Sequence, residues 1–178
     1  GQIELSGNQY LSRAAVLERV AADRGGSVLR DPLEERRRAL EEIPWVERAG
    51  VERILPNRIR VELQERAPVA FLRSGTELAL IDAHGVILAR PRESQFRFPV
   101  VSGLGEATPR APRMQLYMQF LNEIELVRPG AADHVSEVDL SDEKDLRAVL
   151  SDLARLGASG AAASGPVLVH FGEGDFVN

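Results

Sequence analysis

The chain has 178 residues, of which 44% are hydrophobic and 28% are charged, and its formal net charge at pH 7 is −5. This composition is typical of a globular chain of one or two domains, and no apolar run approaches the ~20 residues that a membrane-spanning helix requires. The acidic balance without a basic stripe argues against nucleic-acid binding, and the absence of cysteine excludes disulfides and thiolate metal sites.

The first elements in chain order are a short strand and a helix. Residues 3–5 alternate as a strand does, and the sequence SGN follows them. Ser12 is placed to cap a helix that ends at Gly25-Gly26. The apolar face of this helix consists of Val16, Leu17, Val20 and Ala21.

A second helix is predicted to begin at Asp31, which would cap it, with Pro32 at its first position and Glu34 at capping-box spacing. Its narrow apolar stripe is formed by Leu33, Leu40 and Ile43. The helix must stop at Ile43-Pro44, because proline disfavours the helical region for the residue before it. The basic run 36–38 could touch lipid headgroups, but neighbouring glutamates favour a solvated, self-paired helix face.

After the only tryptophan, Trp45, the pattern changes to that of a β-hairpin. An extended run, 46–55, a Pro56-Asn57 turn and the alternating run 58–65 follow one another. Ile59, Val61 and Leu63 would face a core, while the residues between them meet water. Both helices must then cover one side of a three-stranded sheet, with Trp45 packed under the hairpin and both helices.

The second half begins without a spacer at Pro68, so we expect two rigidly stacked domains. Strands are predicted at 68–72, 77–82 and 86–89, with Gly85 in the turn between the last two. Residues 98–103 are interpreted as a loop, because Pro99 fits an edge or loop position. Residues 112–126 carry apolar side chains at three- and four-residue spacing and predict an amphipathic helix.

The segment 142–156 gives conflicting signals. Leu146, Val149, Leu150, Leu153 and Leu156 have helical spacing behind a Ser141 cap. Strands are predicted around Val135–Leu140 and at 166–171, and 157–165 is predicted to be a loop.

No catalytic or cofactor-binding constellation is found. His84, His134 and His170 lie far apart in the sequence, without carboxylate or histidine partners at metal-site spacing. Residues 172–175, GEGD, are too short for a phosphate-binding motif and are interpreted as a turn. We therefore predict no cofactor, no metal, no small-molecule substrate and no enzymatic activity.

Several motifs resemble the FtsQ/DivIB family of bacterial cell-division proteins. They are SGN after the first strand, IPWVERAGVERILPNRI, the ERAPVAF that follows the hairpin, and LIDAHGVIL. The resemblance implies a polypeptide-transport-associated (POTRA) domain, β-α-α-β-β, at residues 1–66. It implies a second domain at 67–178, mainly an antiparallel β-sheet with one or two helices, so the fold class is α+β. It also favours a strand at 147–151 over the helix.

The function that this resemblance implies is that of a non-catalytic scaffold of the divisome. Such a protein lies on the extracytoplasmic, periplasmic side of the inner membrane at the septum and is held by an N-terminal transmembrane helix that this chain does not contain. FtsB/FtsL-type and other divisome proteins are the expected partners. The alternatives are a POTRA module of an outer-membrane assembly or secretion protein, which would bind unfolded polypeptide, and an enzyme of unknown type.

Two further expectations concern binding. In the family, the region from helix to hairpin has been tied to recruitment, and the matching residues are Arg48, Val51 and Arg53, whose alternative interpretation is ordinary strand residues. The family also continues past VHFGEGDF with a helix and strands that contribute to FtsB binding. We therefore expect the C-terminal helix and strands to be missing here.

Overall fold

The computed structural model describes residues 2–21, 32–151 and 166–171. By their contacts the residues divide into two units, Gly1–Ala67 with Pro91–Ser94, and Pro68–Arg90 with Gln95–Asn178. The two units are described in turn.

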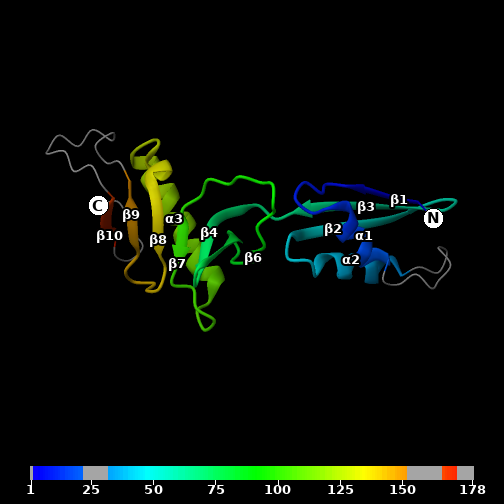
Figure 1. Ribbon diagram of the computed structural model, residues 1–178, viewed down its shortest axis with the longest axis horizontal. Helices are drawn as coiled ribbons and strands as arrows, with labels where there is room; N and C mark the ends of the chain where they lie inside the picture. The colour runs from blue at the N-terminus through cyan, green and yellow to red at the C-terminus, as the bar shows by residue number, and fades with distance from the viewer. Residues whose placement is uncertain (1, 22–31, 152–165, 172–178) are drawn as a thin grey trace. The chain divides into compact units, whose positions relative to one another are not determined.

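The first unit has the predicted order of strand, helix, helix, strand, strand. Its elements are β1 (Gln2–Ser6), α1 (Arg13–Ala21), α2 (Leu33–Glu41), β2 (Val46–Ile54) and β3 (Arg58–Glu65). The sheet order is β1-β3-β2, with β1 parallel and β2 antiparallel to the central β3 (Figure 1). The α+β class is therefore confirmed for this unit, and β2 is an edge strand of the described sheet.

Local capping explains where the helices begin. The Ser12 hydroxyl accepts a hydrogen bond from the Ala15 N–H at 3.1 Å, which confirms the predicted cap of α1. Helix α2 begins at Leu33, so Pro32 occupies the N-cap position and not the first helical position. The predicted cap Asp31 and the predicted stop Gly25-Gly26 lie outside the described residues.

One side of the first sheet is covered by both helices, as predicted. The core joins Val16 and Val20 of α1 and Leu40 of α2 to the inward face of β3, which consists of Ile59, Val61 and Leu63. The basic run behaves differently along its length. Arg37 and Arg38 form ion pairs within α2, but Arg36 is 8% exposed and therefore buried. The prediction of a solvated face is therefore wrong at Arg36, which is buried.

Trp45 is buried, but its neighbours differ from those expected. It is 6% exposed and does not belong to the cluster between the helices and the hairpin. Its ring lies 5.1 Å from that of Tyr10, in the connection between β1 and α1. The Trp45 carbonyl also accepts the Arg66 N–H at 2.8 Å, so this corner joins the start of β2 to the end of β3.

The second unit is a mixed sheet with a long helix. Its elements are β4 (Pro68–Ser74), β5 (Glu77–Asp82), β6 (Ile87–Leu88), β7 (Val100–Ser102), α3 (Arg110–Val127), a short 3-10 helix η2 (Ala131–His134), β8 (Val135–Asp139), β9 (Arg147–Leu150) and β10 (Val167–His170). The strand order is β10-β9-β8-β7-β4-β5-β6. Strand β7 is parallel to both neighbours, and the other pairs are antiparallel.

Two predictions for this unit had different outcomes. The strand interpretation of the ambiguous segment is confirmed, because β9 pairs with β8 and β10. Leu153, Leu156 and the predicted loop 157–165 lie outside the described residues. The loop interpretation of residues 98–103 is wrong, because β7 is an internal strand between β4 and β8. Pro99 is tolerated because it precedes the strand, where its carbonyl accepts the Phe71 N–H at 2.9 Å.

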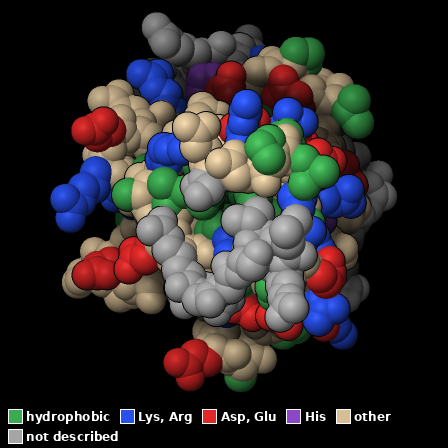
Figure 2. All heavy atoms as spheres, turned by 90° about the vertical axis from the view of Figure 1, so that its right-hand side faces the viewer, with side chains coloured by type: hydrophobic (Ala, Val, Ile, Leu, Met, Phe, Trp, Pro, Cys, Tyr) green, Lys and Arg blue, Asp and Glu red, His purple; other side chains and the backbone are tan. Residues whose placement is uncertain are grey.

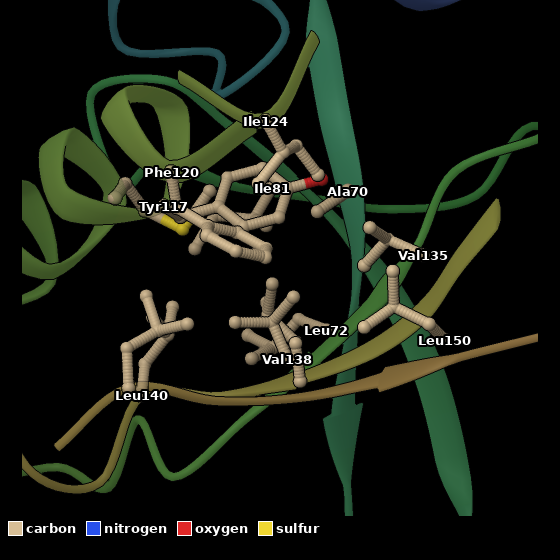
Figure 3. Packing of buried hydrophobic residues seen from close by; sticks show 14 of the residues in the cluster. Ala70, Leu72, Ile81, Tyr117, Phe120, Ile124, Val135, Val138, Leu140 and Leu150 are labelled. Carbon is tan, nitrogen blue, oxygen red and sulfur yellow. The ribbon is translucent and has the colours of Figure 1, made fainter. Parts of the chain in front are cut away.

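Helix α3 closes the core of this unit. Its buried face presents Met114, Tyr117, Phe120 and Ile124 to the sheet, and Figure 3 shows Tyr117 and Phe120 above strand residues such as Leu72 and Val138. The Tyr117 hydroxyl donates to the Val69 carbonyl at 2.9 Å, and burial raises the pKa of Tyr117 well above its ordinary value. The helix is thereby fixed to β4 by a hydrogen bond as well as by packing.

The turn between β5 and β6 is tied to the start of α3. The Asp82 carboxylate accepts the N–H groups of His84 and Val86 at 3.0 and 2.8 Å, and Gly85 has φ 84°. A Cβ on Gly85 would lie 2.8 Å from the Arg110 Cβ, so only glycine fits this approach. The Arg110 Nε–H donates to the Gly85 carbonyl at 3.0 Å.

Candidate interaction surface

The three residues predicted to bind partners lie on β2, and its free edge is the first feature to consider. The Ala49 N–H donates to the Glu41 carboxylate of α2 at 3.2 Å, so the backbone of Ala49 points away from β3. Residues of an antiparallel strand direct their N–H and C=O groups alternately to the two sides. The backbone of Val51, two residues further, therefore also points away from β3, toward the edge.

Glu41, the α2 side chain that contacts this edge, belongs to a row of ion pairs along the helix. Arg37 bridges Glu34 and Glu41, with N···O distances of 2.6 Å to each. The hydrogen bond from Ala49 lowers the pKa of Glu41, burial opposes this shift, and Arg37 adds to it. The hydrogen bond from Arg37 lowers the pKa of Glu34 to about 2. Both carboxylates are thus held ionised, and one of them covers the edge at Ala49.

The sheet does not gather Arg48, Val51 and Arg53 on one face. Arg48 is exposed and lies opposite Gln64, on the side of the sheet away from the helices. Val51 and Arg53 are half-buried and lie opposite Val61 and Ile59, on the helix-facing side. The three residues share one strand and two faces.

The face away from the helices carries a network of opposite charges. Arg58 and Arg60 of β3 lie 3.1 and 3.5 Å from the Glu4 carboxylate of β1, and Arg60 also lies 3.8 Å from Glu52. Figure 2 looks at a different side of the molecule, and there too basic and acidic side chains are interspersed. Exposed pairs of this kind stabilise weakly, by up to ~1 kcal/mol each. This face is wet, as predicted, and the charges of Glu4, Glu52, Arg58 and Arg60 are paired within it.

The remaining sequence candidates do not form a chemical site in the described part of the chain. No group of three or more His, Cys, Asp or Glu side chains there could hold a metal ion. His84 is an exposed turn residue, and the His170 Nδ1 on β10 lies 3.3 Å from Asp145. Residues 172–175 lie outside the described residues. Within the same described ranges, no helix is both long enough and apolar enough to cross a bilayer.

The sequence did not predict that Glu41 of α2 accepts a hydrogen bond from the edge strand β2. The pairing of Glu41 with Ala49 requires knowing that the helix end lies beside β2, and no periodicity reveals this. The edge strand β6 of the second unit was predicted as part of 86–89, and the structure confirms it at Ile87–Leu88, paired with β5.

Comparison with known proteins covers both units. Residues 1–66 match the family model described as POTRA domain, FtsQ-type, and residues 70–176 match that of cell division protein FtsQ/DivIB, C-terminal. A cell division protein FtsQ of Koribacter versatilis is 39% identical over 99% of this chain and 49% of its own length. One of Myxococcus fulvus is 30% identical over 97% of this chain and 58% of its own. The chain thus spans about half the length of these relatives.

Proposed function

Because the chain belongs to the FtsQ/DivIB family of bacterial cell-division proteins, whose members are non-catalytic, we propose that it is the extracytoplasmic scaffold region of such a protein. In this proposal a transmembrane helix holds the full protein at the inner membrane, and the region lies on the periplasmic side at the septum. There it binds FtsB/FtsL-type and other divisome proteins.

Two family matches support a division role over transport. The match of residues 1–66 is to the FtsQ-type POTRA domain, and the match of 70–176 is to the C-terminal domain of the same family. A POTRA module of an outer-membrane assembly or secretion protein would share the first architecture without the second. The division scaffold therefore accounts for the whole matched chain.

The proposed binding mechanism rests on the outward-facing backbone at the edge of β2. The outward N–H of Ala49 donates to Glu41. The backbone of Val51, two residues further along β2, also points away from β3 but lies past the contact with Glu41. A partner strand can add to such an edge, with backbone hydrogen bonds giving affinity and alternate side chains giving specificity. Val51 would meet the partner by its backbone, and Arg48 and Arg53 would flank it on opposite faces of the sheet.

The test separates backbone pairing from side-chain contact. Val51→Pro removes the outward N–H without removing a bond to β3, because proline is tolerated where the N–H of an edge strand points away from the sheet. Val51→Ala shortens the side chain but keeps the N–H, so it is the matched control. Each would be placed in the full-length protein as a fluorescent fusion, in cells depleted of their own FtsQ-type protein.

We expect Val51→Pro to lose co-purification of at least one divisome protein and to divide poorly, while Val51→Ala behaves as the parent. Melting temperatures of the purified chains would show that both are folded. If folded Val51→Pro recruits every partner as the parent does, the β2 edge is not the recruitment surface.

A further inference from the structure

The second unit contains a pocket of about 490 Å³ beside its edge strand β6. Its walls come from β4, β5, β6 and the connection that leads into α3. The residues that matter here are three apolar ones, Leu72, Ala79 and Ile87, and four charged ones, Arg73, Glu77, Glu106 and Arg110. We call the pocket together with the adjoining edge of β6 the β6 site.

Ile87 exposes apolar surface inside a concave site. It is 39% exposed and shares its face of the sheet with Ala79 and Leu72, which also line the pocket. Leu78 pairs with Arg73 on the opposite face. A single exposed apolar side chain is ordinary on a protein surface, but one that lies in a pocket among other apolar residues offers a place for an apolar group.

The backbone of Ile87 points to the open side of β6. The Asp82 N–H donates to the Val86 carbonyl at 3.0 Å, so Asp82 and Val86 form a hydrogen-bonded pair across the hairpin. Ile87 lies opposite Ile81, the next pair, which in an antiparallel ladder is not hydrogen-bonded. Its N–H and C=O are therefore directed away from β5, where the sheet as described has no further strand.

Some of the charged side chains of the β6 site have partners within the structure and others do not. Arg73 pairs with Glu137 at 2.7 Å, and the Nε–H of Arg110 donates to the Gly85 carbonyl at 3.0 Å. Among the residues that the structure describes, neither Glu77 nor Glu106 has an ion-pair partner. Arg110 also has no ion-pair partner among these residues, so its charge offsets one of the two carboxylates and the site keeps one net negative charge. That charge beside an apolar pocket complements a cationic side chain that neighbours an apolar one.

We propose that the β6 site binds an extended segment of a partner protein in which a lysine or arginine alternates with an apolar residue. The segment adds to the Ile87 edge by backbone hydrogen bonds, its apolar side chain enters the pocket beside the Ile87 side chain, and its cation meets Glu77 and Glu106. A second copy of this chain fits less well, because a symmetric contact at this edge would bring the same carboxylates together. The site is separate from the β2 edge and does not depend on the proposed division role.

The probe is a fluorescein-labelled, end-blocked peptide of sequence Lys-Val-Lys-Leu-Lys-Val, titrated with the whole 178-residue chain by fluorescence anisotropy. The control peptide is Glu-Val-Glu-Leu-Glu-Val, which has the same apolar pattern and opposite charge. We expect saturable binding of the basic peptide that weakens as salt rises from 50 to 300 mM, and no binding of the acidic one. Equal binding of both peptides, or of neither, would overturn the proposal.

Variants then locate the binding. Glu77→Gln with Glu106→Gln should raise the Kd of the basic peptide about fivefold, while Glu18→Gln with Glu35→Gln, two exposed changes on α1 and α2, gives the matched loss of charge elsewhere. Ile87→Pro should abolish binding, and Ile87→Val, which keeps the N–H, should not. A Kd that responds equally to the Glu18→Gln, Glu35→Gln pair would show that the effect comes from net charge alone and would overturn the assignment to this site. Concentration-dependent self-association of the free chain, lost in Ile87→Pro, would instead assign the edge to a second copy.

Discussion

At the scale of single residues, Trp45 fixes the corner at which α2 gives way to β2. It follows Pro44, is 6% exposed and lies 5.1 Å from the Tyr10 ring. The N–H of Tyr10 is in turn held by the Glu65 carboxylate at 3.0 Å. Through Tyr10, the segment between β1 and α1 thus contacts both the start of β2, at Trp45, and the end of β3, at Glu65.

Trp45→Ala should lower the unfolding free energy of the first unit by about 3–5 kcal/mol, because it removes a large buried side chain. For a unit of ~65 residues this is a large part of the total stability. Urea unfolding followed by circular dichroism would measure it, and Trp45→Phe, which keeps an aromatic ring near Tyr10, should lose less. An unchanged midpoint for Trp45→Ala would mean that the ring does not support the fold.

Glu41 makes the first unit sensitive to acid. Its pKa is lowered from the ordinary 4.5, first by the Ala49 N–H, so its contribution to stability is complete above pH 4.5 and is lost as pH falls through the folded-state pKa. Glu41→Gln should lower stability at pH 7 by about 1 kcal/mol and flatten the decline as pH falls below 4.5.

The matched control for this measurement is Glu35→Gln, an exposed change on the same helix. Urea midpoints at several pH values would compare the three proteins. A decline in Glu41→Gln as steep as in the parent would show that Glu41 does not titrate differently on folding.

At the scale of elements, a β-bulge decides where the predicted binding residues lie. The register of β2 against β3 shifts between Val46 and Arg48. Without this shift Arg48 would share the helix-facing side with Val46, but the extra residue turns it to the open face. Alternation along the sequence identifies a half-buried strand, yet it cannot show an irregularity that arises from pairing.

The short elements of the second unit show the same limit. Strand β9 has helical spacing in its leucines, and only its neighbours β8 and β10 make the extended form favourable. Strand β7 has three residues and follows a proline, so local preferences indicated a loop. The long α3, the β4–β5 hairpin and the whole β-α-α-β-β order were predictable, because their patterns extend over many residues.

Gly103 allows the strands β7 and β8 to lie side by side. It has φ 81°, and a Cβ there would lie 2.4 Å from the Ser141 nitrogen. Gly75 also has positive φ, 62°, but nothing lies within 4 Å of its would-be Cβ. We expect Gly75→Ala to cost about 1 kcal/mol, from backbone strain alone, and Gly103→Ala at least twice as much. Thermal unfolding would compare the stabilities of the two variants. Equal losses of stability would mean that the backbone at Ser141 moves aside without a free-energy cost.

At the scale of the whole molecule, each unit offers one strand edge on which this account depends. In the first unit Glu41 covers the β2 edge at Ala49, and the N–H and C=O groups of Val51 point outward from the same edge. In the second unit β6 carries the Ile87 edge beside a pocket that has one net negative charge. A scaffold that binds several proteins without chemistry needs such separate, chemically distinct surfaces, since one edge accepts one strand.

Residue-resolved amide exchange by NMR, recorded on the chain with and without an FtsB/FtsL-type partner, tests the strand-addition claim most directly. The account predicts that the amide of Val51 becomes strongly protected on binding. The amides of Gly50 and Glu52, which pair with Glu62 and Arg60 of β3, should change little. Binding that leaves the Val51 amide as exchangeable as in the free chain would contradict strand addition at β2.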